Sequence, residues 1–279
     1  MAIARRYAAS ISALYVYPPL FMPVPGLPPP GERVSDVELQ RVRTRTASMF
    51  ESADAGDLEV DVLVDVGQPA PHIIDRAASL PADLIVMGTH GASGFEHLVL
   101  GSVTEKVLRQ ARCPVLTVPP RAQATSTLPF KRLLCAVDFS DSSLRGLELA
   151  SSLATESGAA LTVLHVVEWP WQEPPPPPLY DLPPEQASAL AEFRRYLERS
   201  ATERLKGLLP EAARERCRTV LRVAHGKSYV EILRAAADEH ADLILMGVHG
   251  RNAADLMLFG STTSQVVRRA TCPVMTLRR

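Results

Sequence analysis

The sequence predicts two consecutive open α/β domains, each built on a parallel sheet, from three observations. First, short β-branched and Leu-rich segments alternate with helical patterns in the second half. These segments lack the regular polar alternation of half-exposed strands, which suits strands covered on both faces. Second, residues 67–119 align without a gap with residues 226–278, which indicates a duplicated domain. Third, a length of 279 residues suits two ordinary domains.

The second half shows the complete pattern of elements. We expect its strands at 133–137, 161–167, 219–224, 243–246 and 274–277. One helix between them is indicated by an apolar stripe at three- and four-residue spacing, made of Leu190, Phe193, Leu197, Ala201, Leu205 and Leu208. Such alternation implies right-handed βαβ units and helices on both faces of a parallel sheet. We therefore expect five strands here and four in the first half.

The first half has no counterpart of Lys131–Ala160, which is predicted to form a strand, a polar turn and a helix ending at Gly158. The stretch "MAIARRYAAS" is then the remnant of that first helix, and the first domain lacks its first strand. Either the domain is naturally clipped or the true start lies upstream of Met1, and both remain open. We expect domains at residues 1–120 and 129–279.

Composition limits the classes of partner. The formal net charge is −1, without a basic stripe, which argues against nucleic acid. Apolar runs are too short to span a bilayer, so no membrane partner is expected. The N-terminal "YAASISALYVYPPLFMPVPG" superficially resembles a signal peptide, but Pro18 and Pro19 interrupt it early. The repeat assigns it to a strand, and we expect a cytoplasmic protein.

Cysteines and prolines add little chemistry. The four cysteines form no C-x-x-C pair and no zinc spacing, so we expect buried apolar residues in a reducing compartment. Proline-rich segments follow the strand near residue 17 and the strand near residue 167. They are predicted to be surface loops, with a polyproline ligand for another protein as the alternative.

A glycine pattern occurs in both halves at the ends of two predicted elements. Gly247 and Gly250 follow a strand, and nine residues later Gly260 and Ser261 begin a helix; the first half repeats this spacing. Ligands of open α/β sheets bind at the carboxyl ends of strands, and a helix N-terminus attracts phosphate. Ser261 and Thr263 can add hydroxyl donors. The pattern thus predicts a phosphate cradle.

The same residues also fit a purely structural role. A Gly-Ser pair at a helix start is an ordinary N-cap, and residues 102–105 fit a capping box that needs no ligand. Neither G-x-x-x-x-G-K-[ST] nor G-x-G-x-x-G is present. From the pattern alone, capping and phosphate binding both remain open.

Taken together, these motifs resemble the universal stress protein family. The resemblance rests on the duplicated glycine motif and on "AVDFSDSS", "LTVLHV", "ADLILMGVHG" and "ATCPVMTL". It covers residues 131–279 fully and the available part of residues 4–119. It implies Rossmann-like domains of the adenine nucleotide alpha hydrolase type, with strand order 3-2-1-4-5. Many members bind ATP, and the intact glycine motif marks the binders.

The resemblance assigns nucleotide contacts residue by residue. Asp138 matches an acidic residue beside adenine and ribose, and Val166 a strand position whose backbone meets adenine. The full second-half set is Ala136, Asp138, Val166, Met246, Gly247, His249, Gly250, Gly260, Ser261, Thr262 and Thr263. The first half keeps Val16, Met87, Gly88, His90, Gly91, Gly101, Ser102, Val103 and Thr104. It has no partner for Asp138, which leaves occupancy of that site open.

The resulting hypothesis is a tandem, ATP-binding, stress-response regulatory protein without catalytic residues. Mg²⁺ would arrive with the phosphates, because no metal-ligand spacing is present. His90 and His249 are predicted to shape the loop rather than to act as bases, and His165 to be a packed core residue. The resemblance also implies that "PVLTV" and "PVMTL" pair within one chain as a pseudo-dimer, with a further homodimer left open. The alternatives are a slow ATPase or self-phosphorylating protein, and a ligand-free interaction scaffold.

Overall fold

The computed structural model describes residues 1–17, 34–52, 57–89, 100–120, 122, 130–168, 183–209, 211–248 and 260–278. They form two compact units. One contains the described residues of Met1–Ala82, and the other contains those of Asp83–Gln123 and Pro129–Arg279. The proline-rich segments predicted as loops lie outside the described residues.

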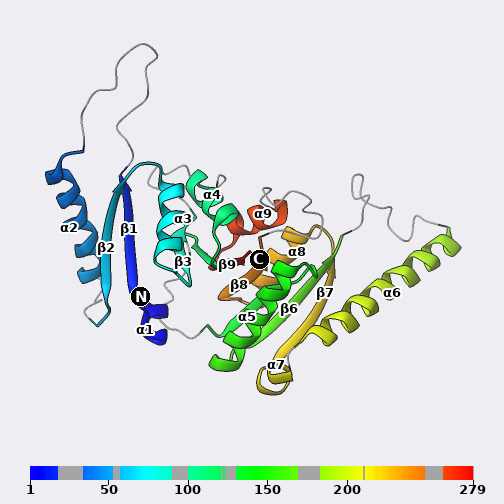
Figure 1. Cartoon of the computed structure of the whole chain (residues 1–279). Helices are drawn as coiled ribbons and strands as arrows, with labels where there is room; N and C mark the ends of the chain where they lie inside the picture. The colour runs from blue at the N-terminus through cyan, green and yellow to red at the C-terminus, as the bar shows by residue number, and fades with distance from the viewer. Residues whose placement is uncertain are drawn as a thin grey trace, which may run out of the picture. The chain divides into compact units, whose positions relative to one another are not determined.

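The larger unit is built on a seven-stranded sheet with the order β3-β4-β9-β8-β5-β6-β7 (Figure 1). Its strands are β3 (Ile85–Gly88), β4 (Val115–Val118), β5 (Arg132–Ala136), β6 (Ala160–Val167), β7 (Thr219–His225), β8 (Leu243–Gly247) and β9 (Val274–Leu277). The five second-half strands are all parallel to one another. Counted within that half, their order from β7 is 3-2-1-4-5, the order implied by the resemblance.

Helices cover both faces of this sheet (Figure 1). They are α4 (Ser102–Gln110), α5 (Asp141–Ser157), α6 (Pro184–Leu208), α7 (Glu211–Arg216), α8 (Ser228–Asp238) and α9 (Ser261–Arg269). The Ser140 hydroxyl caps the start of α5 by accepting from the Ser143 amide. Gly158 ends α5 in the left-handed region. Leu147, Ala150 and Ala154 turn its apolar face into the core.

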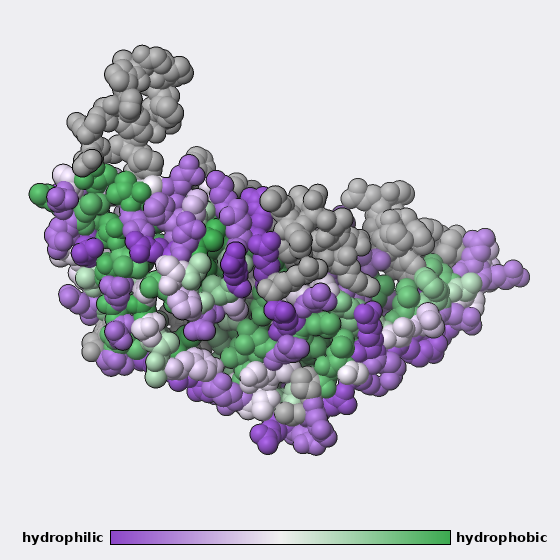
Figure 2. Space-filling view, viewed as in Figure 1, coloured by the Kyte–Doolittle hydropathy of each residue, from purple (hydrophilic) through white to green (hydrophobic). Residues whose placement is uncertain are grey.

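Only two residues of the stripe predicted on α6 are buried, and Leu208 at its carboxyl-terminal end is exposed. Ala201 and Leu205 lie in the core, whereas Phe193 is exposed and Leu190 and Leu197 are half-buried. Figure 2 shows apolar residues along one side of α6 and polar residues along the other. The periodicity therefore predicted the helix correctly, but not how far along its length it is covered.

The smaller unit contains a two-stranded parallel sheet, β1 (Ile11–Tyr17) beside β2 (Val60–Val66). Its helices are α1 (Ala2–Tyr7), α2 (Asp36–Ser52) and α3 (Pro69–Ser79). The strand assigned by the repeat to the N-terminal apolar run is thus present. Helix α1 ends as α5 does. The Ala9 amide donates to the Ala4 carbonyl at 2.9 Å, and the Ala159 amide to the Ala154 carbonyl at 3.1 Å. The stretch "MAIARRYAAS", which was predicted to be the end of a helix, therefore forms a helix end.

One expectation about the first half is wrong. Its four strands do not form a single sheet: β1 pairs with β2, while β3 pairs with β4 in the larger sheet. The physical reason lies in the missing strand. In the second half β5 lies between β6 and β8 and hydrogen-bonds to both. Among the described residues the first half has no counterpart of β5, and β1 and β3 lie in different sheets.

The two halves meet at β4 and β9, which pair antiparallel with Leu116 opposite Met275. Side chains reinforce this pairing. The Thr117 hydroxyl donates to the Val274 carbonyl at 3.1 Å, and the Thr276 hydroxyl to the Val115 carbonyl at 3.4 Å. The segments "PVLTV" and "PVMTL" therefore pair within one chain, as expected.

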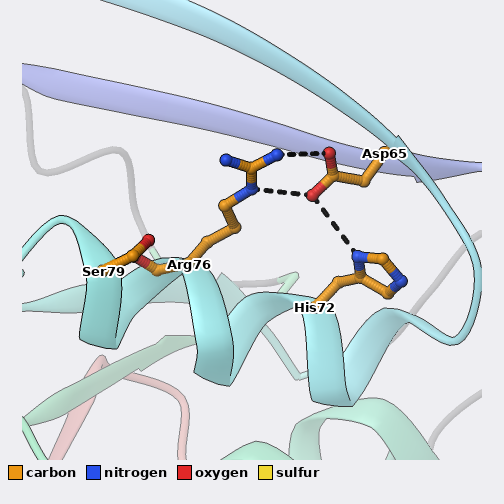
Figure 3. A network of polar contacts seen from close by, with 4 residues as sticks. All are labelled: Asp65, His72, Arg76 and Ser79. Carbon is orange, nitrogen blue, oxygen red and sulfur yellow. Dashed lines mark hydrogen bonds and ion pairs between the residues drawn. The ribbon is translucent and has the colours of Figure 1, made fainter.

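A polar network occupies one edge of the smaller unit (Figure 3). The Asp65 carboxylate on β2 accepts from the Arg76 guanidinium at 2.7 and 2.9 Å, and His72 Nδ1 lies 3.4 Å from it. The Arg76 guanidinium, with His72, lowers the pKa of the Asp65 carboxyl below its ordinary value. The repeat places Ala224, Glu231 and Ala235 at the corresponding positions of the second half, so this network belongs to the first half alone.

All four cysteines are free. Cys135 is fully buried, and burial raises the pKa of its thiol to about 12. Cys113, Cys217 and Cys272 are half-buried, so the prediction of buried apolar residues holds fully only for Cys135. Among the described residues, no helix is both long and apolar enough to cross a membrane.

Candidate functional site

Two hydrogen bonds hold the end of β8 to the start of α9, and a third holds the end of β8 to β9. The Thr263 hydroxyl, in the first turn of α9, donates to the Gly247 carbonyl at 2.9 Å. The Gly260 amide donates to the Val248 carbonyl at 3.2 Å, and the Val248 amide to the Leu277 carbonyl at 2.9 Å. These bonds hold the N-terminus of α9, called its mouth below, beside the carboxyl ends of the strands.

Both glycines of this junction are required by close backbone approach. A Cβ at Gly260 would lie 2.8 Å from the Val248 carbonyl oxygen, and one at Gly247 would lie 2.9 Å from the Ser143 amide nitrogen. Neither neighbour is the end of a flexible side chain, so neither can move aside cheaply. The glycines therefore allow the start of α5, the end of β8 and the start of α9 to converge.

Asp138 lies at the same edge, in the turn between β5 and α5. One carboxylate oxygen, Oδ1, accepts from the Ser140 amide at 3.0 Å and from the Ser140 hydroxyl at 2.5 Å. The other oxygen, Oδ2, makes no hydrogen bond to the part of the chain that the structure describes. Asp138 is half-buried. Asp138 thus stabilises the turn through Oδ1, and Oδ2 can accept a hydrogen bond from a ligand.

Phe139, next to Asp138, has an unusual backbone. Its φ of 66° lies in the left-handed region, which costs a bulky residue about 1–2 kcal/mol. Its ring centroid lies 4.6 Å from that of His165, and the Arg204 guanidinium carbon lies 4.0 Å from the ring centroid. These contacts offset the strain and fix the turn that carries Asp138.

The adenine side of the predicted site is formed by strand ends. Ala136 ends β5 and Met246 lies near the end of β8, and they are in register with each other. Val166, on β6, is half-buried and in register with Ala224. His165 donates from Nδ1 to the Val137 carbonyl at 2.7 Å and is buried, which confirms it as a packed core residue.

The capping box that the sequence left open as an alternative is not formed at the first-half helix. Gly101, not Ser102, is the N-cap of α4, and no side chain caps that helix. Ser102 stands at the first helical position rather than at the N-cap, the position from which a hydroxyl accepts from the third helical amide. Gly260 is likewise the N-cap of α9, without a side-chain cap. The first-turn amides of both helices are therefore not satisfied by side-chain capping within the described residues.

The hydroxyls at the α9 mouth differ in availability. Ser261 is exposed and Thr262 is half-buried. Thr263 is buried, and its hydroxyl proton is used in the bond to Gly247. Thr263 therefore helps to position the helix, and donation from its hydroxyl to a ligand stays a prediction.

The first half repeats this junction. The Thr104 hydroxyl donates to the Gly88 carbonyl at 3.0 Å, and the Gly101 amide to the Thr89 carbonyl at 3.1 Å. Met87, Gly88 and residues 101–104 all belong to the larger unit, whereas Val16 lies on β1 of the smaller unit. The predicted first-half residues are thus divided between two units.

Some predicted residues lie outside the described part of the chain: His90, Gly91, His249 and Gly250. The described part contains no cluster of His, Cys, Asp and Glu that could hold a metal. Sequence reasoning missed Phe139, Ser140, Ser142 and Arg204. The polar stretch "DFSDSS" signalled a turn, but not that its Phe would adopt positive φ or stack under an arginine distant in sequence.

The arrangement defines a Rossmann-like α/β protein whose candidate ligand site lies where strand order reverses, between β5 and β8. The model of the universal stress protein family matches residues 1–119 and again residues 129–278. The chain therefore belongs to the universal stress protein family, with two such regions in tandem.

Individual relatives agree with this assignment. A universal stress protein of Methanocaldococcus jannaschii is 36% identical over 118 residues, 42% of this chain and 68% of that protein. One from Thermus aquaticus is 34% identical over 149 residues, 53% of this chain and 99% of that protein. One from Mycolicibacterium smegmatis is 31% identical over 206 residues, 72% of this chain and 63% of that protein.

A solved structure agrees on the fold. The crystal structure of a universal stress protein from Archaeoglobus fulgidus matches 97% of this chain and 86% of its own with a TM-score of 0.63. Its sequence identity to this chain is 24%, so the likeness concerns the fold alone.

Proposed function

We propose that this protein binds ATP at the carboxyl edge of β5 and β8, with the phosphates at the mouth of α9. The single observation that carries the proposal is the convergence at this edge. The uncapped first turn of α9, the end of β8 and the Asp138 turn are held together by the contacts of Gly247, Gly260 and Thr263. A helix mouth of this kind offers amide hydrogens and the positive end of the helix dipole to a phosphate.

Each residue has a distinct role in this proposal. The amides of residues 261–263 and the exposed Ser261 hydroxyl donate to phosphate oxygens. Asp138 Oδ2 accepts from the ribose or the base, because Oδ1 is already committed to Ser140. The ends of β5, β6 and β8 at Ala136, Val166 and Met246 border the adenine. Mg²⁺ enters with the phosphates, since it seldom has an all-protein cage.

We propose binding rather than turnover, and one contact restrains one of the two hydroxyls that turnover would use. The slow-ATPase alternative had Ser261 or Thr263 beside the terminal phosphate. Thr263 uses its hydroxyl proton in the bond to the Gly247 carbonyl, so it is held as a structural contact. The proposed role is therefore a cytoplasmic regulatory protein of the stress response that responds to the nucleotide it holds.

We also propose domains at residues 1–120 and 129–279 arranged as a pseudo-dimer. The antiparallel pairing of β4 with β9 supports this arrangement. The given first-half sequence contains no residue equivalent to Asp138. Nucleotide binding in the first half would need another residue to take that role.

Isothermal titration of the full chain with MgATP tests the site. Ser261→Glu places a carboxylate at the α9 mouth, where we expect affinity to fall by at least about a hundredfold through like-charge repulsion. The fold should survive, because Ser261 is exposed and an acidic residue in the first turn stabilises a helix. Ser102→Glu is the matched control at the α4 mouth. If the intact protein gives no binding heat, or if Ser261→Glu binds as tightly as the unaltered chain, the site is not where we place it.

A further inference from the structure

Helix α6 reaches the turn that carries Asp138 through a row of three side chains. The guanidinium carbon of Arg204, on α6, lies 4.0 Å from the centroid of the Phe139 ring. That centroid lies 4.6 Å from the centroid of the His165 ring on β6. His165 is itself buried and bonded to the Val137 carbonyl. The row therefore connects a helix, a turn and a strand that are far apart in the sequence.

The backbone of Phe139 needs such support. The described residues include three non-glycine residues with positive φ, and two of them, Ala8 and His240, follow the ends of helices. Left-handed residues are common at that position. Phe139 instead lies between a strand and a helix, at φ 66°. A bulky residue keeps this conformation only where its surroundings hold it.

The conformation of Phe139 decides where the Asp138 carboxylate points. Asp138 Oδ1 accepts from the amide and from the hydroxyl of Ser140, so both bonds span Phe139. If φ of Phe139 relaxed to a negative value, Ser140 would move relative to Asp138 and these bonds would break. Oδ2, the oxygen free to accept from a ligand, would then be redirected as well.

Arg204 is well placed to hold this turn. Its neighbours Ala201 and Leu205 are buried, and α6 packs against β6 and β7, so the helix is anchored at this point. The Arg204 side chain is exposed, and it forms no ion pair or hydrogen bond with the described residues. A cation over an aromatic ring at an exposed site contributes about 0.5–1 kcal/mol. The strain at Phe139 is of comparable size.

We propose that Arg204 is a positioning residue for recognition of the nucleoside part of the ligand, an inference that rests on the proposed function. Its guanidinium holds Phe139 in the left-handed region, and Phe139 keeps Asp138 Oδ2 directed toward the ribose or the base. The phosphate side of the site is held separately, by the contacts of Gly247, Gly260 and Thr263. Nucleotide affinity therefore depends on α6, a helix outside the glycine motif.

Thermodynamic linkage makes this dependence reciprocal. If α6 helps to hold Asp138 for the nucleotide, the bound nucleotide in turn stabilises the part of α6 that carries Arg204. We expect ATP to slow hydrogen exchange of the amides of residues 201–208 in the unaltered chain. In an Arg204→Gln chain, ATP should leave their exchange unchanged.

Isothermal titration of the full chain with MgATP tests the role of Arg204. Arg204→Gln removes the cation and keeps good helix propensity, so we expect Kd to rise about two- to fivefold, the value of one exposed cation–π contact. Arg204→Lys keeps a cation and should restore most of the affinity. Arg199→Gln is the matched control, because it makes the same charge change at another exposed position of α6. It should bind as the unaltered chain does.

A double-mutant cycle tests whether Arg204 acts through Asp138. Asp138→Asn keeps an oxygen for Ser140 and replaces the acceptor Oδ2 by an amide group. In that background Arg204→Gln should cause no further loss of ATP affinity. In the ligand-free chain, Arg204→Gln alone should speed hydrogen exchange of the Ser140 amide.

The outcomes separate this inference from the proposed function. If the unaltered chain binds no ATP, both are refuted. If it binds ATP and Arg204→Gln binds as tightly, only the role of Arg204 is refuted. The same holds if Arg199→Gln weakens binding equally, if the losses from Arg204→Gln and Asp138→Asn simply add, or if exchange of the Ser140 amide is unchanged.

Discussion

Thr104 and Thr263 make the same hydrogen bond in the two halves, from a helix-start hydroxyl to the carbonyl of the glycine that ends the preceding strand. The distances are 3.0 and 2.9 Å. The surroundings of this bond differ. In the second half the start of α5 packs onto Gly247 through Ser142 and Ser143, whereas the given first-half sequence contains a counterpart of only the end of α5. The repeated segment thus carries the junction in both halves, and in the second half α5 covers it.

The largest expected effect on stability concerns the contact between α5 and Gly247. Gly247→Val would drive a side chain into the backbone of α5, because even its Cβ would lie 2.9 Å from the Ser143 amide. We expect about 3 kcal/mol or more of destabilisation of the larger unit. Gly88→Val, at the exposed first-half position, should cost clearly less. Urea unfolding followed by circular dichroism measures both. Equal losses would show that the two glycines have equivalent surroundings after all.

A smaller effect distinguishes the two helix ends. Ala8 and Gly158 both terminate a helix in the left-handed region, at φ of 49° and 64°. Only glycine adopts this conformation without strain. Ala8→Gly should therefore stabilise the smaller unit by about 1 kcal/mol, and Gly158→Ala should destabilise the larger unit by about as much. No atom lies within 4 Å of a Cβ at Gly158, so the backbone alone is tested. Changes of the same sign in thermal unfolding would refute this account of the helix ends.

The smallest effect depends on pH and on the Asp65 network. Because Arg76 lowers the pKa of Asp65, this interaction stabilises the fold above the ordinary carboxyl pKa of about 3.9. Its contribution is lost as the pH falls through the lowered value. Arg76 is substantially exposed, so we expect less than about 1 kcal/mol.

Hydrogen exchange of the β2 amides at pH 5 and pH 3 measures this contribution. Asp65→Asn should remove the acid-dependent part for the smaller unit. In the second half Ala224 stands at this position, so β7 should show no matching change. An Asp65→Asn protein with unaltered acid sensitivity would assign the effect to other carboxylates.

Most of the second-half fold was predictable from the sequence. Its strands were expected within about one residue of their observed bounds, because buried parallel strands are continuous apolar runs flanked by helical patterns. The pairing of β4 with β9 followed from the family resemblance rather than from periodicity. The division of the first-half strands was not predicted. It depends on the absence of one central strand, and a count of strands does not reveal which strand bridges its neighbours.

The candidate site was predictable in part. Asp138, Gly247 and Gly260 were expected at one edge and are found there. The bond from the Thr263 hydroxyl to the Gly247 carbonyl was not predicted, since a sequence does not show which acceptor a hydroxyl will meet. Phe139 could not be anticipated, because its positive φ is compensated by Arg204, 65 positions along the chain.

The ladder between Leu116 and Met275 has a practical consequence for anyone who cuts this protein in two. A scission between the repeats, near residue 125, would strip β9 of its antiparallel neighbour and leave the Val274 and Val115 carbonyls without their threonine donors. In the isolated carboxyl-terminal fragment, β9 would be an apolar edge strand exposed to solvent and prone to aggregation. Strands β4 and β9 of the two repeats thus depend on each other for their pairing at this edge.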